Sequence, residues 1–127
     1  MGLPQQHRLR RRQDFGQLHA KGMRLKAFCF AMRLRRRSPQ ASAPAPSPRP
    51  LPTRIGISVS LKVDKRAVVR NRIRRQVQAI FRQLLPAVAP GWDILVIAQP
   101  TATRCDYARF LQELKQLLAD AEVFHGY

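Results

Sequence analysis

The feature that most constrains the fold is a two-sided helical pattern at residues 65–85, KRAVVRNRIRRQVQAIFRQLL. Asn71, Arg75, Gln78 and Arg82 recur at spacings of three and four along one side of this pattern. On a helix of about 3.6 residues per turn, the large apolar residues form a single stripe on the opposite side. That stripe consists of Val69, Ile73, Val77, Ile80, Phe81 and Leu84. The pattern predicts a helix that buries one face in a core and offers guanidinium groups to a polyanion on the other.

An Arg-rich helix face is often only a solvated surface, so this alternative has to be weighed against a binding role. Solvation alone would be favoured if carboxylates lay one turn away, because such i,i+4 pairs neutralise the charge. Residues 66–85 contain neither Asp nor Glu. We therefore interpret the basic side of the helix as a binding face.

The charge of the whole chain limits the partners it can have. Lys and Arg number 24 against 7 Asp and Glu, which gives a formal net charge of +17. Such an excess opposes compaction at neutral pH unless a polyanion screens it, so the partner should be nucleic acid or an anionic membrane. Most of the acidic residues follow Arg82, and few of the basic ones do. The end of the chain therefore does not belong to the basic surface.

A membrane partner is disfavoured. The basic helix carries a full core-type stripe, and no run approaches the roughly 18–20 apolar residues of a spanning helix. The N-terminus is basic, but no apolar segment of the signal-peptide type follows it. We expect a cytoplasmic protein with no membrane contact.

The length and the cysteine content indicate one ordinary domain. A chain of 127 residues is long enough for one core, so we expect a single domain over 1–127. Cys29 and Cys105 lie far apart, without a CxxC motif or a His at ligand spacing. This pattern signals neither a disulfide framework nor a zinc site, and we expect two small side chains that are buried or half-buried.

The rest of the chain alternates between helical and strand patterns, which predicts an α+β or α/β sandwich with helices over a sheet of about four strands. Residues 38–52 are mostly Pro, Ala and Ser with one Arg, which predicts a flexible loop. We interpret this loop as a tolerated surface insertion; the alternative is a Pro-rich docking segment. The expected elements are an extended arm at 1–12, a short helix at 13–21, a weakly marked strand at 23–26, strands at 28–35, 54–61 and 93–98, and a helix at 107–118 after the basic one.

Two of these elements carry more specific expectations. In the last helix, Asp106 can cap the N-terminus, the apolar stripe starts at Tyr107, and Glu113 and Asp120 should point outward. In the strand at 54–61, one face holds only Gly and Ser. Such a face leaves room for a ligand to approach the backbone, although a helix could equally cover it.

The residues that an independent hydrolase needs are not grouped in this sequence. Its 3 His residues form no HExxH or comparable motif, and its 7 acidic residues suggest no two-metal site. No Gly-rich phosphate loop is present either. We expect no catalytic residue and no protein-held metal.

The sequence does hold the parts of an RNA-binding surface. Basic residues on the arm, at the strand ends and on the helix can contact phosphates, which gives affinity that falls steeply with salt. Those of the arm and the strand ends are Arg8, Arg10, Arg11, Arg12, Arg33, Arg35, Arg36 and Arg37. Phe15, Phe28 and Phe30 could stack on unpaired bases. The alternative is that they belong to the core, which is the stronger reading for Phe28 and Phe30.

One segment resembles a known family. Residues 54–82, RIGISVSLKVDKRAVVRNRIRRQVQAIFR, look like the signature of the bacterial ribonuclease P protein component, with its strand, loop and helix around an R-N-R core. The flanks agree: LRRRQDFGQLHAKG at 9–22 resembles the family's N-terminal helix, and WDILVIAQP resembles its last strand. The resemblance covers nearly the whole chain except the Pro-rich insertion.

The resemblance implies an α+β fold of the order α-β-β-β-α-β-α, a sandwich with a four-stranded sheet and a left-handed βαβ crossover, similar to domain 2 of ribosomal protein S5. General chain-crossing rules alone would favour a right-handed crossover. The resemblance also implies a heterodimeric RNA–protein holoenzyme, the ribonucleoprotein endonuclease ribonuclease P, in which the RNA subunit cleaves the 5′ leader from precursor tRNA with Mg²⁺ bound mainly by RNA and substrate.

The same resemblance assigns residues to two sites. Contacts with the RNA subunit would come from Lys62, Lys65, Arg66, Arg70, Asn71, Arg72 and Arg75. Contacts with the precursor-tRNA leader would come from Arg12, Phe15, His19, Phe28, Ser58 and Ser60. The chain departs from the family pattern at His19 and Ala31, where aromatics are frequent, and at Asp64, where Gly is frequent.

Two alternatives come from other classes of protein. A ribosomal or other structural RNA-binding protein of the same fold would keep the basic helix but would need no leader cleft. A helix-turn-helix DNA-binding protein would need a second helix directly before the basic one. The strand pattern at 54–61 occupies that place, so we do not expect DNA as a partner.

Overall fold

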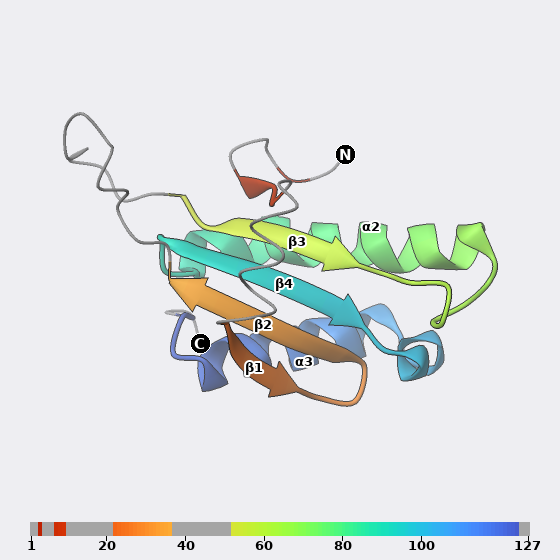
Figure 1. The fold of residues 1–127 in the computed structure, drawn as a ribbon. Coiled ribbons are helices and arrows are strands. Elements are labelled where there is room, and N and C mark those ends of the chain that lie inside the picture. Colours follow the sequence, from red (N-terminus) through yellow and green to blue (C-terminus); the bar gives the residue numbers. More distant parts are fainter. Residues whose placement is uncertain (1–2, 4–6, 10–21, 37–51, 125–127) are drawn as a thin grey trace.

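A four-stranded sheet carries two helices on one of its faces (Figure 1). The computed structural model describes residues 3, 7–9, 22–36 and 52–124. The expected helix at 13–21 and most of the Pro-rich loop at 38–52 lie outside these residues. The elements are β1 (Met23–Lys26), β2 (Phe30–Arg36), β3 (Arg54–Ser58), α2 (Ala67–Leu84), the 3₁₀ turn η2 (Leu85–Ala87), β4 (Trp92–Ala98), the 3₁₀ turn η3 (Pro100–Arg104) and α3 (Tyr107–Asp120).

The strand order β1-β2-β4-β3 gives a mixed sheet. β2 pairs antiparallel with both β1 and β4, whereas β3 runs parallel to β4. In Figure 1, β3 and β4 point the same way with α2 behind them, so the β3-α2-β4 connection is left-handed. The hand implied by the family resemblance is therefore confirmed, and the general right-handed expectation was wrong for this chain.

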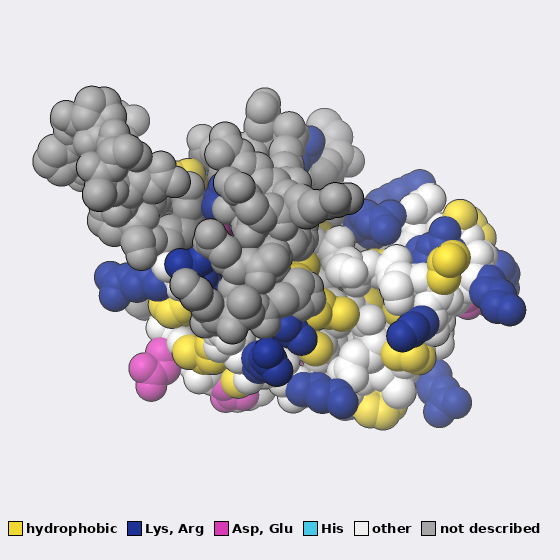
Figure 2. Space-filling model, viewed as in Figure 1, with side chains coloured by type: hydrophobic (Ala, Val, Ile, Leu, Met, Phe, Trp, Pro, Cys, Tyr) yellow, Lys and Arg dark blue, Asp and Glu magenta, His cyan; other side chains and the backbone are white. Residues whose placement is uncertain are grey.

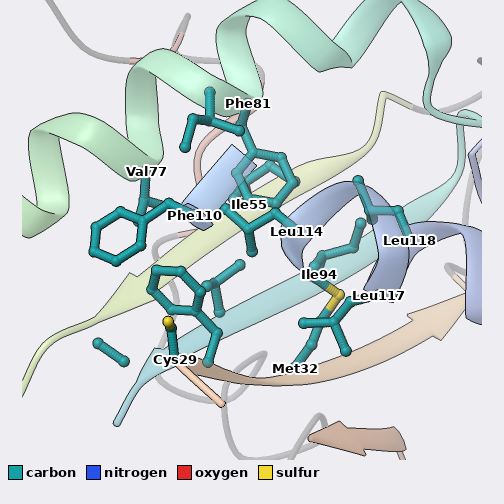
Figure 3. Close-up of a cluster of buried hydrophobic side chains, with 14 of the residues drawn as sticks. Cys29, Met32, Ile55, Val77, Phe81, Ile94, Phe110, Leu114, Leu117 and Leu118 are labelled. Atoms are coloured by element: carbon teal, nitrogen blue, oxygen red, sulfur yellow. The ribbon is translucent and has the colours of Figure 1, made fainter. Parts of the chain in front are cut away.

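The core fills the space between the sheet and the two helices. The register places Met32 opposite Val96 and Ile55 opposite Ile94, so alternate residues of β2, β3 and β4 face the helices. In Figure 3, side chains of α2 and α3 point toward these strands. Phe30 and Phe110 meet edge to face, with ring centroids 4.8 Å apart. Phe30 is thus a core residue.

The apolar stripe of the basic helix is confirmed residue by residue. All six of its members, from Val69 to Leu84, are buried. Burying a side chain of this size contributes about 1.5–3 kcal/mol relative to leaving it exposed. The stripe therefore fixes which side of α2 meets the sheet, and with it which side meets solvent.

The stripe of α3 differs from the expectation at two positions. Tyr107, its expected first member, is 37% exposed because it is the first residue of α3 and lies at the edge of the helix layer. Glu113, expected to point outward, is buried. Its Oε1 accepts hydrogen bonds from the backbone N–H groups of Cys29 (2.6 Å) and Phe30 (3.0 Å), donors that the sheet leaves unpaired at the start of β2. The capping role of Asp106 is confirmed, since its side chain accepts from Arg109 N–H.

Two further differences concern β3 and the cysteines. β3 ends at Ser58, three residues earlier than expected, because its partner β4 ends at Ala98 and the chain turns at 60–63. Cys29 is buried and Cys105 half-buried, as expected, but the fold also joins them in a disulfide across 76 residues of sequence. None of the helices in the described ranges has the length and hydropathy that crossing a bilayer requires.

Candidate nucleic-acid interface

The loop that leads from β3 into α2 is held by hydrogen bonds from Arg70. Its Nη1 donates to the backbone carbonyl oxygens of Asp64 (3.1 Å) and Lys65 (2.9 Å). The guanidinium therefore points back along the helix toward its N-terminus and is half-buried. Of the residues assigned to the RNA subunit, Arg70 is one whose side chain already donates hydrogen bonds within the chain.

Asp64, the departure from the family pattern in this loop, fixes the turn directly before the helix. Its Oδ1 accepts from the backbone N–H of Arg66 at 2.8 Å, and its two oxygens accept from the Arg66 side chain at 3.1 Å each. Arg66, the N-cap residue, makes no side-chain cap of its own. The hydrogen bond from the Arg66 side chain lowers the pKa of the Asp64 carboxyl, and the same contact raises the pKa of Arg66. A carboxylate at this end also complements the helix dipole.

The outer side of α2 carries the other members of the predicted RNA-binding set. Asn71, Arg72 and Arg75 are exposed. Arg74 Nη1 donates to Asn71 Oδ1 at 2.9 Å. Asn71 therefore orients Arg74, a basic residue of α2 that was not assigned to the site from the sequence. The spacing of three between Asn71 and Arg74 is the signal that could have identified it. Within the described ranges, no carboxylate lies within ion-pair distance of Arg72 or Arg75.

The loop residues Lys62 and Lys65 are exposed beside α2. Two apolar side chains in the same region, Leu61 and Val68, are also exposed. Figure 2 shows Lys and Arg side chains gathered at the end of the molecule where β3 leads into α2, with yellow apolar side chains between them. The structure thus brings the predicted RNA-subunit residues together on one continuous surface, which we call the α2 face: residues 62–66 and the outer side of α2.

The sheet face opposite the helices holds the expected small residues of β3. Gly56 lies opposite Leu95 and Ser58 opposite Ile97 in the register with β4. Leu9 packs on Leu95, and its N–H donates to the carbonyl of Ile55 at 3.0 Å, so part of this face is covered by the chain itself. Ser58 and Ser60 remain exposed. Arg12, Phe15 and His19, the other residues assigned to the leader, lie outside the described residues.

Phe28 lies apart from these serines. It belongs to the turn between β1 and β2, at the opposite edge of the sheet from β3. The hydroxyl of Thr101 donates to its carbonyl, and the guanidinium carbon of Arg109 lies 5.4 Å from the centre of its ring. The ring therefore leans toward α3, on the helix side. It is 48% exposed, so one face is available for stacking, but Ser58 and Ser60 are not its neighbours.

The described residues offer no group of three or more His, Cys, Asp or Glu side chains that could hold a metal ion. The side chains of the described residues therefore do not fit a protein-held Mg²⁺ site.

The fold and the α2 face together define a class: an α+β protein with a basic helix for binding nucleic acid. Comparison with known proteins narrows the class. The profile of the Ribonuclease P family matches residues 3–122, so the chain belongs to that family. Proteins of this family are the protein component of ribonuclease P, a ribonucleoprotein endoribonuclease, and membership implies partnership with an RNA subunit.

Relatives and solved structures agree with the family match. The ribonuclease P protein component of Cyanothece sp. is 53% identical over 130 residues, covering 98% of this chain and 99% of the relative. That of Microcystis aeruginosa is 47% identical and covers both chains completely. The RNase P protein of Staphylococcus aureus has a TM-score of 0.76 at 26% identity, over 93% of this chain and 97% of that one. The RNase P protein of Thermotoga maritima has a TM-score of 0.72 at 28% identity, over 89% and 96%.

Proposed function

We propose that this chain binds the RNase P RNA through the α2 face and the 5′ leader of precursor tRNA through another surface. In doing so it assists the Mg²⁺-dependent cleavage that gives the mature 5′ end of tRNA. The observation that carries the proposal is the α2 face itself: exposed Arg72 and Arg75, without carboxylate partners among the described residues, in a chain of the ribonuclease P family.

The roles within the α2 face differ from residue to residue. Arg72, Arg75, Lys62 and Lys65 are exposed and can neutralise phosphates directly. Arg70 acts indirectly, because its hydrogen bonds to the loop carbonyls set the position of 62–66 against the helix. Arg66 and Asn71 contribute in both ways, since each contacts a neighbour and is exposed.

For the leader, we propose the small-residue end of β3, where Ser58 and Ser60 are exposed, together with Arg12, Phe15 and His19. Hydroxyl groups and small side chains allow a single strand to lie close to the backbone. The place of Phe28 at the opposite edge means that it can stack only on a nucleotide that passes the β1–β2 turn. We further propose that the Mg²⁺ ions are held by RNA and substrate, and that the complex works in the cytoplasm as one RNA and one protein.

Reconstituted cleavage tests this function. The purified protein and the RNase P RNA of the same organism are mixed with precursor tRNA at low Mg²⁺, and the cleavage rate is compared with that of the RNA alone. We expect clear stimulation with a leader of several nucleotides and a much smaller effect with a one-nucleotide leader. Folded protein that binds the RNA without stimulating cleavage would instead support a purely structural RNA-binding role.

A further inference from the structure

A groove of about 280 Å³ lies between α2 and the segment formed by η3 and the start of α3. Its apolar lining comes from Ile73, Ala102 and Phe110, all of which are buried. Ligand pockets in proteins usually measure about 300–1,000 Å³, so this groove is at the small end and suits a group of the size of one nucleobase. It lies on the helix side, away from the serines of β3.

Hydrogen-bond donors and hydrogen-bond acceptors both line the same groove. Arg72 and Gln76 supply donors from α2, and the Gln76 amide also supplies an acceptor. From the other wall, the Thr103 hydroxyl donates its hydrogen to the Pro100 carbonyl at 2.9 Å, which leaves the oxygen as an acceptor. Asp106 adds carboxylate oxygens. The edge of an unpaired base also presents donors and acceptors side by side, so these groups can pair with it.

One aromatic ring completes the groove. Tyr107, the first residue of α3, lines it and is 37% exposed, although a typical apolar stripe would have buried it. Bases of single-stranded RNA commonly stack on such partly exposed rings. The exposed part of the Tyr107 ring is therefore available to a flat partner.

The charges around the groove favour a nucleotide over other flat ligands. Arg72 belongs to the groove and to the α2 face at once, so a polyanion bound along α2 passes directly over it. Arg104 at the end of η3 is also exposed, next to the lining residues Thr103 and Cys105. These two guanidinium groups place positive charge beside the groove, which complements a phosphate backbone.

We propose that this groove takes one unpaired nucleotide of the RNA subunit, with its base against Tyr107 and its phosphate at Arg72. The inference rests on the proposed function, because it assumes that the RNase P RNA lies along the α2 face. It adds a base-contacting site to a surface otherwise suited to phosphates. A phosphate contact holds the RNA in place, and a captured base additionally sets the register of the RNA on the protein.

The test combines binding with base-specific chemical probing of the full-length RNase P RNA. The variants are Tyr107→Ala, Tyr107→Phe and Gln76→Ala, with Met23→Ala as the control, because Met23 is an exposed apolar residue on β1, outside the groove. Tyr107→Ala should raise the Kd about 5- to 150-fold, the range expected for loss of one base–aromatic stack. Tyr107→Phe keeps the ring and should stay within about twofold.

The probing identifies the base. With wild-type protein, one unpaired base should be protected from dimethyl sulfate or carbodiimide, and it should become reactive with Tyr107→Ala and with Gln76→Ala. The salt dependence of Tyr107→Ala should match that of wild type, because stacking releases no counterions. Suppose that wild-type protein binds the RNA, and that Tyr107→Ala binds equally well and leaves the same bases protected. The groove proposal is then overturned, while the proposed function stands. If wild-type protein does not bind the RNA, the proposed function falls with it.

Discussion

The Arg70 guanidinium donates to the Lys65 carbonyl at 2.9 Å, and this bond joins the α2 helix to the loop that precedes it. A second bond from the same nitrogen reaches the Asp64 carbonyl. The first arginine of the R-N-R segment thus stabilises the fold, whereas Arg72 is exposed and can contact a partner. The residues of this motif therefore have different roles. Replacing all three together would mix a loss of stability with a loss of RNA binding.

Separate substitution of Arg70 and Arg75 should distinguish the two duties. Arg70→Ala removes both hydrogen bonds to the loop and should lower the free energy of unfolding by about 1 kcal/mol. Arg75→Ala, at an exposed position of the same helix, should change it by less than about 0.5 kcal/mol. Urea denaturation followed by circular dichroism measures both values. Equal stability losses in the two variants would show that the Arg70 contacts do not hold the loop.

The buried carboxylate of Glu113 should be among the most sensitive positions of the fold. Glu113→Ala leaves the N–H groups of Cys29 and Phe30 without their acceptor, and each such loss costs about 1–3 kcal/mol. We expect a loss of about 2–6 kcal/mol in the free energy of unfolding, and a smaller loss for Glu113→Gln, which keeps one acceptor oxygen. Asp120→Ala, an exposed acidic position on the same helix, serves as the control. A loss as small as that of the control would show that the hydrogen bonds between Glu113 and the start of β2 do not stabilise the fold.

Asp64 should make the loop sensitive to acid. The pKa of its carboxyl lies below the ordinary value of 3.8, first because its side chain accepts a hydrogen bond from the Arg66 side chain. Because the folded-state pKa lies below the unfolded one, the stabilisation is complete above the unfolded value and is lost as pH falls through the folded value. An NMR titration of the Asp64 carboxyl carbon should therefore give a midpoint below 3.8. In Arg66→Gln the midpoint should rise toward that value, and an unchanged midpoint would refute the assigned cause.

The Cys29–Cys105 disulfide should stabilise the protein only under oxidising conditions. It closes a long loop, and disulfides of this kind contribute about 2–4 kcal/mol, mainly by restricting the unfolded chain. Reduction should lower the Tm of the wild type and leave that of Cys105→Ala unchanged. Two free thiols in the untreated, denatured protein would show that the bond does not form.

How far the sequence predicts the fold depends on whether a feature is local. The burial of the six apolar stripe residues of α2 follows from the helical period alone, so it could be predicted fully. Glu113 could not, because its two donors lie more than 80 residues away in sequence and no local pattern places them beside α3. The pairing of Cys29 with Cys105 and the left hand of the crossover are tertiary features of the same kind.

The candidate site likewise has features that follow from local sequence and features that depend on tertiary packing. The exposure of Asn71, Arg72 and Arg75 follows from the helical period, and the contact of Arg74 with Asn71 follows from a spacing of three. The groove beside Tyr107 requires η3 and α3 to pack against α2, which no spacing reveals. The distance of Phe28 from the β3 serines likewise depends on the strand order.

The most direct test of the central claim is the salt dependence of binding to the RNase P RNA. Each phosphate contact that is lost should reduce the slope of log K against log salt by about one. The double variant Arg72→Gln/Arg75→Gln should therefore have a slope lower by about two. Lys26→Gln/Lys115→Gln removes the same charge from β1 and α3 and should keep the wild-type slope. The account is contradicted if both double variants change the slope equally, or if the α2 variant leaves it unchanged.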